Sequence, residues 1–217
     1  MPPIRLIIFD LDGTLVNTSA DITAALNYAV APYAIPPISV AETITLVGEG
    51  ATALIDKVLR AKAPDIDPAA VLKAFIAYYA DHIADRAVPY PGVAEALAAL
   101  SQVTKAVVSN KMEALSVGVL DALGLLDYFD YVSGGDTSAE KKPSPVPILD
   151  ALSRFAVHPA DALLVGDSIY DMLAARASGV RSVAALYGFG SPGFSQGADF
   201  TIERLGELVD IVKRLNG

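Results

Sequence analysis

Short apolar runs alternate with longer helical patterns over most of the chain, and this alternation leaves few folds open. Apolar runs of this length, separated by helical segments, are typical of parallel strands joined by crossover helices. We therefore expect an α/β fold whose Rossmann-like core is a doubly wound parallel sheet. The expected strands are Arg5–Phe9, Lys105–Val108, Tyr131–Ser133, Ala162–Val165, Ser182–Leu186 and Phe200–Ile202.

The segments between these strands carry helix signals. Gly124 and Gly179 stand just after two of the helical patterns, at the position where glycine commonly ends a helix. The expected helices cover residues 111–123, 144–156, 168–178 and 203–215.

From about residue 17 to residue 86 the pattern changes, because this stretch has helix signals and no strand signal. Ser39 and Glu42 have the spacing of a capping box, and Asp67 followed by Pro68 fits the start of another helix. Apolar residues then recur at spacings of three and four, which predicts one buried helix face. They are Val71, Leu72, Phe75, Ile76 and Tyr79.

The chain is therefore expected to form two domains. An α/β catalytic core would comprise residues 1–16 and 87–217, and a helical cap of residues 17–86 would be inserted after the first strand. The connections would lie near Asn17–Ser19 and Ala87–Gly92, and the prolines and glycine of the second favour a stiff hinge.

The composition argues against several classes of protein. The 217 residues include no cysteine, which excludes disulfides, thiolate zinc sites and a cysteine nucleophile. A net charge of -9 without a cluster of Lys and Arg argues against nucleic acid as a partner. No apolar stretch approaches the roughly 18 residues of a membrane span, and the amino-terminal segment lacks the features of a signal peptide. We therefore expect a cytoplasmic protein that does not bind membranes.

Three of the expected strands are followed by polar residues of the kinds that act in catalysis or bind metal ions. Ligands of an open parallel sheet bind beyond the carboxyl ends of its strands, so these residues are expected to converge on one edge. They are Asp10 and Asp12 after the first strand, Ser109 and Asn110 after the second, Asp167 after the fourth, Asp171 one turn into the next helix, and Lys142 at the start of the intervening helix.

Clustered carboxylates repel one another unless a cation holds them, and magnesium is the cation that best suits carboxylates together with a phosphate oxygen. Asp10 would be ionised at neutral pH and could attack phosphorus without an activating base. Asp12 could protonate the departing oxygen and then deprotonate the hydrolytic water. The phosphate oxygens would be held by Ser109, Asn110 and Lys142.

Four segments, in this order, resemble the motifs of the haloacid dehalogenase-like hydrolases: "DLDGTLV", "VVSNK", "KKP" and "VGDSIYD". The helical insertion resembles the cap of that family. Within the family the chain most resembles the phosphoglycolate phosphatases, on the strength of "VGEGATALIDKVL", "EKKPSPVPIL" and "GDSIYDMLAARASG" followed by "LYGFG".

The resemblance implies a magnesium-dependent phosphomonoester hydrolase that forms a phosphoaspartate and acts on 2-phosphoglycolate. The implied catalytic residues are Asp10 as nucleophile, Asp12 as acid and base, and Lys142. The implied metal residues are Asp10, Asp12 through its main-chain carbonyl, Asp167, and Asp171 in support. Two positions depart from the family: Asn17 stands where relatives often have aspartate, and Ser109 where many have threonine.

Several alternatives stay open. A phosphatase of the same family could act on pyrophosphate, a sugar phosphate or a nucleotide, and a phosphomutase would keep all four motifs. A dehalogenase would need neither Asp12 nor the metal carboxylates. A phospho-accepting receiver module would lack both the D-x-D-G-T opening and a helical insertion. The segment "GFGSPG" matches a dinucleotide fingerprint, but Pro192 and the absence of a following helix favour a loop.

The expected partner is a small phosphorylated metabolite, bound by a monomer or a homodimer. Its carboxylate could be held by the helix start after "VGEGA" or by a basic residue of the cap. The basic candidates are Lys57, Arg60, Lys62 and Lys73. Lys141 is a less favoured alternative to Lys142, and His82 and His158 fall outside every motif and are expected at the surface or in packing.

Overall fold

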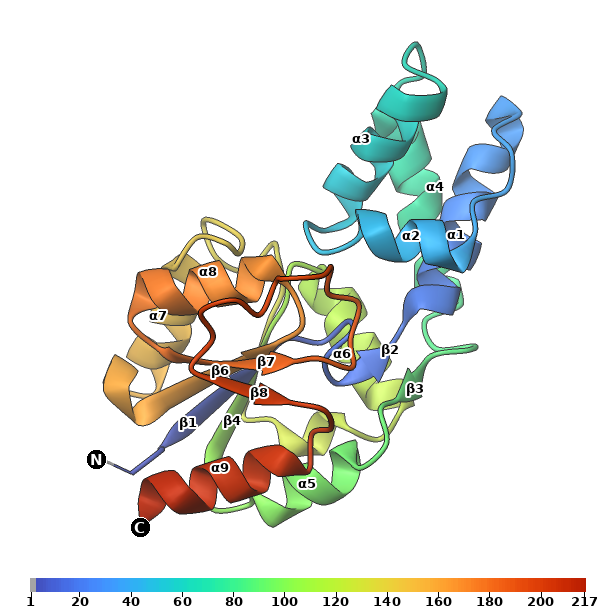
Figure 1. Cartoon of the computed structure of the whole chain (residues 1–217). Helices are drawn as coiled ribbons and strands as arrows, with labels where there is room; N and C mark the ends of the chain where they lie inside the picture. Colours follow the sequence, from blue (N-terminus) through green and yellow to red (C-terminus); the bar gives the residue numbers. More distant parts are fainter. Residues whose placement is uncertain (1–2) are drawn as a thin grey trace.

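A six-stranded parallel sheet lies at the centre of the computed structural model, which describes residues 3–217 (Figure 1). The strand order is β5-β4-β1-β6-β7-β8, and every neighbouring pair is parallel. The strands are β1 (Leu6–Phe9), β4 (Thr104–Val108), β5 (Tyr131–Ser133), β6 (Ala162–Gly166), β7 (Arg181–Ala185) and β8 (Phe200–Ile202). The predicted α/β class and its six strands are confirmed, with ends that shift by one residue in four strands.

Helices cover both faces of the sheet. Alternate residues of each strand point to opposite sides, and the apolar side chains on each side are buried against helices. Ile7 and Phe9 of β1 pack in a cluster with α5, α6 and α9, whereas Leu6 and Ile8 pack with α7 and α8. The helices are α5 (Val93–Ala99), α6 (Glu113–Ala122), α7 (Val146–Arg154), α8 (Ile169–Ser178) and α9 (Glu207–Asn216), with 3₁₀ turns at Leu126–Tyr128 and Pro159–Asp161. The short helix α5 was not expected from the sequence. Gly179 ends α8 in the left-handed conformation, as predicted.

Four further helices form a group beside the sheet and have an apolar cluster of their own (Figure 1). They are α1 (Ser19–Val30), α2 (Val40–Leu46), α3 (Ala51–Lys62) and α4 (Pro68–Asp81), with a 3₁₀ turn at Ala31–Tyr33 after α1. The Ser39 hydroxyl accepts a hydrogen bond from the Glu42 amide, and the Asp67 carboxylate accepts one from Ala69. Both helix starts predicted from the sequence are therefore confirmed.

Two short antiparallel strands, β2 (Val16–Asn17) and β3 (Val88–Pro89), carry the chain between the sheet and the helical group. The buried Asp21 carboxylate of α1 accepts hydrogen bonds from the amides of Arg86 and Ala87, at 3.1 and 2.8 Å, and ties the two connections together. The sequence did not predict these strands. The exact domain boundaries stay a prediction, and the pair of strands β2 and β3 lies beside the predicted boundaries.

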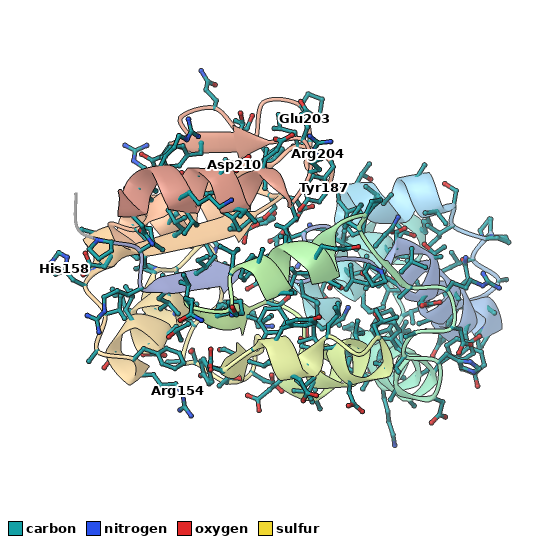
Figure 2. The ribbon with its side chains drawn as sticks, turned by 90° about the horizontal axis from the view of Figure 1, so that it is seen from below. Arg154, His158, Tyr187, Glu203, Arg204 and Asp210 are labelled. Atoms are coloured by element: carbon teal, nitrogen blue, oxygen red, sulfur yellow. The ribbon has the colours of Figure 1, made fainter. Side chains whose placement is uncertain are left out.

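The two histidines lie where the sequence analysis expected them. His158 sits at the end of the sheet region remote from the helical group, where its ring accepts a hydrogen bond from the Ala160 amide (Figure 2). His82 is paired with Asp85 at the surface. None of the helices in residues 3–217 combines the length and the apolar character needed to cross a bilayer.

Candidate active site

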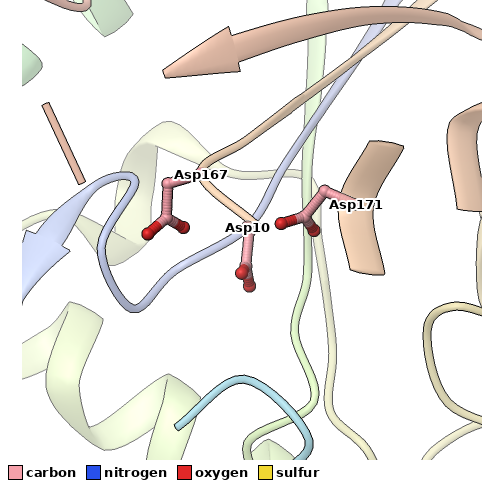
Figure 3. A group of neighbouring side chains, drawn as sticks. All are labelled: Asp10, Asp167 and Asp171. Carbon is pink, nitrogen blue, oxygen red and sulfur yellow. The ribbon is translucent and has the colours of Figure 1, made fainter. Parts of the chain in front are cut away.

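Three carboxylates converge at the carboxyl edge of the sheet. Asp10 follows β1, Asp167 follows β6, and Asp171 lies in the first turn of α8. One oxygen from each residue lies within 4.8 Å of the others, and Figure 3 shows the three side chains as neighbours. Asp171 is fully buried and Asp167 nearly so. The convergence predicted from the strand ends is therefore present.

The charge of this cluster is only partly balanced. The ammonium of Lys142, itself buried, lies 3.1 Å from Oδ1 of Asp10 and 2.6 Å from Oδ1 of Asp171. Burial raises the pKa of Asp10 to about 6, although Lys142 opposes the shift, and the charges of Asp171 and Asp12 add to it. Burial, together with Asp10 and Asp171, also raises the pKa of Asp167 well above its ordinary value. When all three carboxylates are ionised, the cluster and the one ammonium carry two net negative charges, which fit a divalent cation with a preference for oxygen ligands.

Asp167 is held by groups from two distant segments. The Thr14 hydroxyl donates to its Oδ1 at 3.0 Å, and the Phe189 amide donates to its Oδ2 at 2.6 Å. A Cβ atom on Gly188 would lie 2.3 Å from the Cβ of Asp167, so only glycine allows this approach. The segment "GFGSPG" is a loop, as predicted, and it supports Asp167.

Asp171 has two functions in this arrangement. Its Oδ2 accepts hydrogen bonds from the amide and the hydroxyl of Ser168, which caps α8 in a reciprocal capping box. Its Oδ1 pairs with Lys142. Asp171 therefore both takes part in capping the start of α8 and belongs to the carboxylate cluster.

The Asp12 carboxylate does not belong to this group of three. Its Oδ1 accepts hydrogen bonds from the Thr18 hydroxyl at 2.6 Å and from the Lys111 ammonium at 2.5 Å. Burial by itself would lower the pKa of Lys111, but Asp12 and the Tyr79 hydroxyl outweigh burial and raise it. The Asp12 carboxylate is thus held on the side of the helical group, and its predicted catalytic and metal roles stay predictions.

Ser109 and Asn110 are both buried beside the cluster. The amide nitrogen of Asn110 donates to the carbonyls of Gly48 and Lys142, each at 2.8 Å, and its oxygen accepts the Lys142 amide at 3.0 Å. The side chain of Asn110 therefore joins Lys142 to the loop before α3. Such a link between two segments could not be read from the sequence.

A cavity of about 450 Å³ separates the sheet edge from the helical group. Its polar floor contains Asp10, Asp12, Ser109, Asn110, Lys111 and Asp167. The helical group supplies mainly apolar side chains, namely Ile22, Ile44, Val47, Leu54 and Phe75, together with Lys57 and Tyr79. Gly50 and Ala51, at the start of α3, also line it.

The four basic residues proposed from the sequence for a substrate carboxylate differ in their positions. Lys57 lines the cavity, but its ammonium pairs with Glu49 and donates to the Leu46 carbonyl. Glu49 also accepts a hydrogen bond from the Tyr170 hydroxyl of α8, at 2.7 Å. Outside the cavity, Lys62 pairs with Glu42, and Arg60 and Lys73 do not line it.

Comparison with known proteins decides the family. The family model described as "Haloacid dehalogenase-like hydrolase" matches residues 7–185. The chain belongs to the haloacid dehalogenase-like hydrolases. This hydrolase is 35% identical to the phosphoglycolate phosphatase of Chromobacterium violaceum, over 97% of each chain.

Solved structures agree with this family in fold. The hydrolase superposes on a predicted phosphoglycolate phosphatase from Haemophilus somnus with a TM-score of 0.93 and 29% identity, over 97% of this chain and 99% of the other. It is also similar to CbbY from Rhodobacter sphaeroides in complex with phosphate, with a TM-score of 0.83 and 26% identity over 94% and 96% of the two chains.

Three elements of this hydrolase's site were missed by the sequence analysis. Lys111 was noted only as the end of "VVSNK", although a lysine directly after a strand that carries site residues is itself a signal. Tyr79 was assigned to a buried helix face; its ring is buried, but its hydroxyl accepts a hydrogen bond from Lys111 at 2.9 Å. The support that Phe189 gives to Asp167 had no local signal beyond the two flanking glycines.

Proposed function

We propose that this chain is a magnesium-dependent phosphatase that hydrolyses 2-phosphoglycolate through a phosphoaspartate on Asp10. The observation that carries the proposal is the position of Asp10, which lies on the cavity floor beside two further carboxylates and the Lys142 ammonium. The family and the named relative support a phosphatase.

Asp10 would act as the nucleophile. Its Oδ1 accepts the Leu11 amide at 2.7 Å and lies 3.1 Å from Lys142, whereas no described residue donates to Oδ2. A carboxylate held in this way has a fixed direction of attack and one oxygen with free lone pairs. Its attack on phosphorus forms the acyl phosphate bond while the bond between phosphorus and the leaving oxygen breaks.

Asp12 would carry the protons. Both of its hydrogen bonds go to Oδ1, so Oδ2 stays open to the leaving oxygen and later to water. In the first step Asp12 gives its proton to the alkoxide, and in the second step it takes a proton from the water that attacks the phosphoaspartate. Hydrolysis returns Asp10 to its starting state and releases phosphate.

The residues around Asp10 fit a magnesium ion. Asp10 and Asp167 would hold it, together with the main-chain carbonyl of Asp12 and with Asp171 in support. Bound magnesium would offset the negative charge of the phosphoryl oxygens. The hydroxyl of Ser109 and the ammonium of Lys142 would hold the same oxygens, and Asn110 would act by keeping the main chain of Lys142 in place.

The Chromobacterium violaceum phosphatase supports 2-phosphoglycolate as the substrate. A phosphomutase is less well supported, because a second phosphate would need a cation on the cap side of the cavity. The only cap-side lysine that lines it within residues 3–217, Lys57, is paired with Glu49.

Phosphate release across a panel of substrates tests the proposal. The panel comprises 2-phosphoglycolate, pyrophosphate, a sugar phosphate and a nucleotide, each with magnesium or with a chelator. We expect the highest kcat/KM for 2-phosphoglycolate and no turnover in chelator. A higher kcat/KM for pyrophosphate or for the sugar phosphate would contradict the substrate and leave the phosphatase mechanism standing.

A further inference from the structure

Lys111 occupies an unusual position for a lysine. Its side chain is 7% exposed, and its ammonium reaches the wall of the cavity between Asp12 of the sheet edge and Tyr79 of α4. The nitrogen lies 2.5 Å from Oδ1 of Asp12, 2.9 Å from the Tyr79 hydroxyl and 4.8 Å from the centre of the tyrosine ring. Two segments that are distant in sequence therefore hold this ammonium at the cavity wall.

Among the residues that the structure describes, Lys57 and Lys111 are the lysines that line the cavity, and they differ in what their ammonium groups can still bind. Lys57 pairs with Glu49 and donates to a main-chain carbonyl. Lys111 has two acceptors, Asp12 and Tyr79, and an ammonium has three N–H bonds. The third N–H of Lys111 has no acceptor among residues 3–217 and can bind a ligand oxygen.

The covalent structure of the substrate limits where its carboxylate can lie. In 2-phosphoglycolate a single methylene separates the carboxylate from the oxygen that bridges to phosphorus. The proposed function brings that bridging oxygen to Asp12, which must protonate it. The group that binds the carboxylate must therefore be a close neighbour of Asp12. Lys111 meets this condition, because its ammonium donates a hydrogen bond to the Asp12 carboxylate.

We propose that Lys111, oriented by Tyr79, is the residue that recognises the carboxylate of the substrate and so sets the preference for 2-phosphoglycolate. This inference rests on the proposed function, because it takes Asp12 as the group that meets the leaving oxygen. The start of α3 lines the same cavity, but among the described residues that line it, Lys111 is the one that donates a hydrogen bond to Asp12. Tyr79 acts as a positioning residue, since it contacts Lys111 and comes from the helical group.

The test compares 2-phosphoglycolate with its neutral amide, 2-phosphoglycolamide, which has nearly the same shape. Steady-state kinetics are measured for the wild type, Lys111→Met, Tyr79→Phe and Lys57→Met. A charged hydrogen bond is lost only for the acid, so Lys111→Met should lower kcat/KM for the acid about tenfold or more beyond its effect on the amide. The excess loss should fall mainly on KM, because the carboxylate is bound in both the ground state and the transition state.

The other variants separate recognition from general damage. Tyr79→Phe keeps the lysine and removes its second acceptor, so it should reduce the same ratio by a smaller factor. Lys57→Met should leave the ratio of acid to amide unchanged. If Lys111→Met lowers kcat/KM equally for the acid and the amide, Lys111 only supports Asp12. If instead Lys57→Met reduces the ratio of kcat/KM between acid and amide, recognition belongs to the cap. Either result overturns the proposal.

Inhibition constants distinguish this inference from the proposed function. Both compounds are also measured as competitive inhibitors of p-nitrophenyl phosphate hydrolysis, with thermal unfolding as a check on the fold of each variant. If the wild type does not hydrolyse 2-phosphoglycolate, the proposed substrate fails, yet the ratio of the two inhibition constants still tests Lys111. A ratio that is the same in the wild type, Lys111→Met and Tyr79→Phe would overturn the inference alone.

Discussion

The ammonium of Lys142 lies 3.1 Å from Oδ1 of Asp10, although the two residues belong to the third and the first of the chain's four motifs. This ion pair is nearly closed to solvent, with 2% of the Lys142 side chain and 13% of the Asp10 side chain exposed. An ammonium at this distance both orients the carboxylate and offsets the charge of an incoming phosphate. The proposed nucleophile is therefore prepared before the substrate binds.

Replacing the nucleophile should stop catalysis without unfolding the protein. Asp10→Asn is nearly isosteric, but an amide is a poor nucleophile, so turnover should be abolished. Thermal unfolding and phosphate release measure the two effects separately. Retention of more than about a tenth of the wild-type rate would contradict the assignment of Asp10 as the group that attacks phosphorus.

Replacing Asp12 should slow the reaction according to the leaving group. Asp12→Asn removes the general acid and base, and we expect a loss of at least about a hundredfold for an alkyl phosphate. The loss should be smaller in the first step for an aryl phosphate, whose leaving oxygen needs no proton. Rates measured with both kinds of substrate check this, and wild-type rates on both would contradict a proton-transfer role.

Removing divalent cations should abolish activity. Chelation should stop phosphate release, magnesium should restore it, and calcium should inhibit, because calcium takes more oxygen ligands at longer distances. Activity assays with each added cation provide the measurement. Full activity in excess chelator would contradict the proposed metal site.

The stability of the metal-free protein should depend on pH through the buried carboxylates. In the folded protein the pKa of Asp10 is raised from 3.8 to about 6, so between these values the folded state keeps a proton that the unfolded state has lost. The contribution of Asp10 to stability is therefore present at low pH and is lost as the pH rises toward 6.

The variant Asp10→Asn isolates this effect. The Tm of Asp10→Asn relative to wild type, both in chelator, should increase from about pH 4 to pH 6 and then level off. Magnesium added at neutral pH should raise the Tm of the wild type, because a ligand of the folded state stabilises it. A Tm difference that stays constant across this pH range would contradict the raised pKa.

A methyl group on the loop beside Asp167 should disturb the site. Gly188→Ala would place a Cβ 2.3 Å from both the Asp167 Cβ and the Gly13 carbonyl oxygen, so one of them must move. We expect a loss of about 1–3 kcal/mol in stability and weaker magnesium binding. Gly206→Ala is the matched control, because nothing lies within 4 Å of a Cβ there and its φ of -55° suits alanine. Equal magnesium affinity and Tm in both variants would contradict the role of Gly188.

Local patterns in the sequence were enough to predict the sheet and the edge at which its candidate site residues lie. Strands such as β1 and β6 are buried on both faces, so they appear as continuous apolar runs, and a parallel sheet brings residues that follow such runs to one edge. The helix starts at Ser39 and Asp67 were also predictable from local sequence, because a capping side chain accepts a hydrogen bond from an amide only two or three residues away.

The elements that were missed depend on contacts between distant residues. Strands β2 and β3 have two residues each, too few for a periodic pattern, and they exist because the two connections pair. The side-chain amide of Asn110 was predicted to bind phosphate, and this stays a prediction; the tertiary structure also brings Gly48 and Lys142 to it. No local pattern encodes which of these partners an amide will meet.

Tyr79 and Lys111 show which features follow from local sequence and which depend on tertiary packing. The spacing of apolar residues in α4 correctly predicts that the Tyr79 ring is buried, because burial of a helix face follows from its own periodicity. Whether the hydroxyl meets carbon, water or an ammonium depends on how the helical group lies against the sheet edge. That packing brings Lys111 between Tyr79 and Asp12, and their hydroxyl and carboxylate oxygens offset the cost of burying its ammonium.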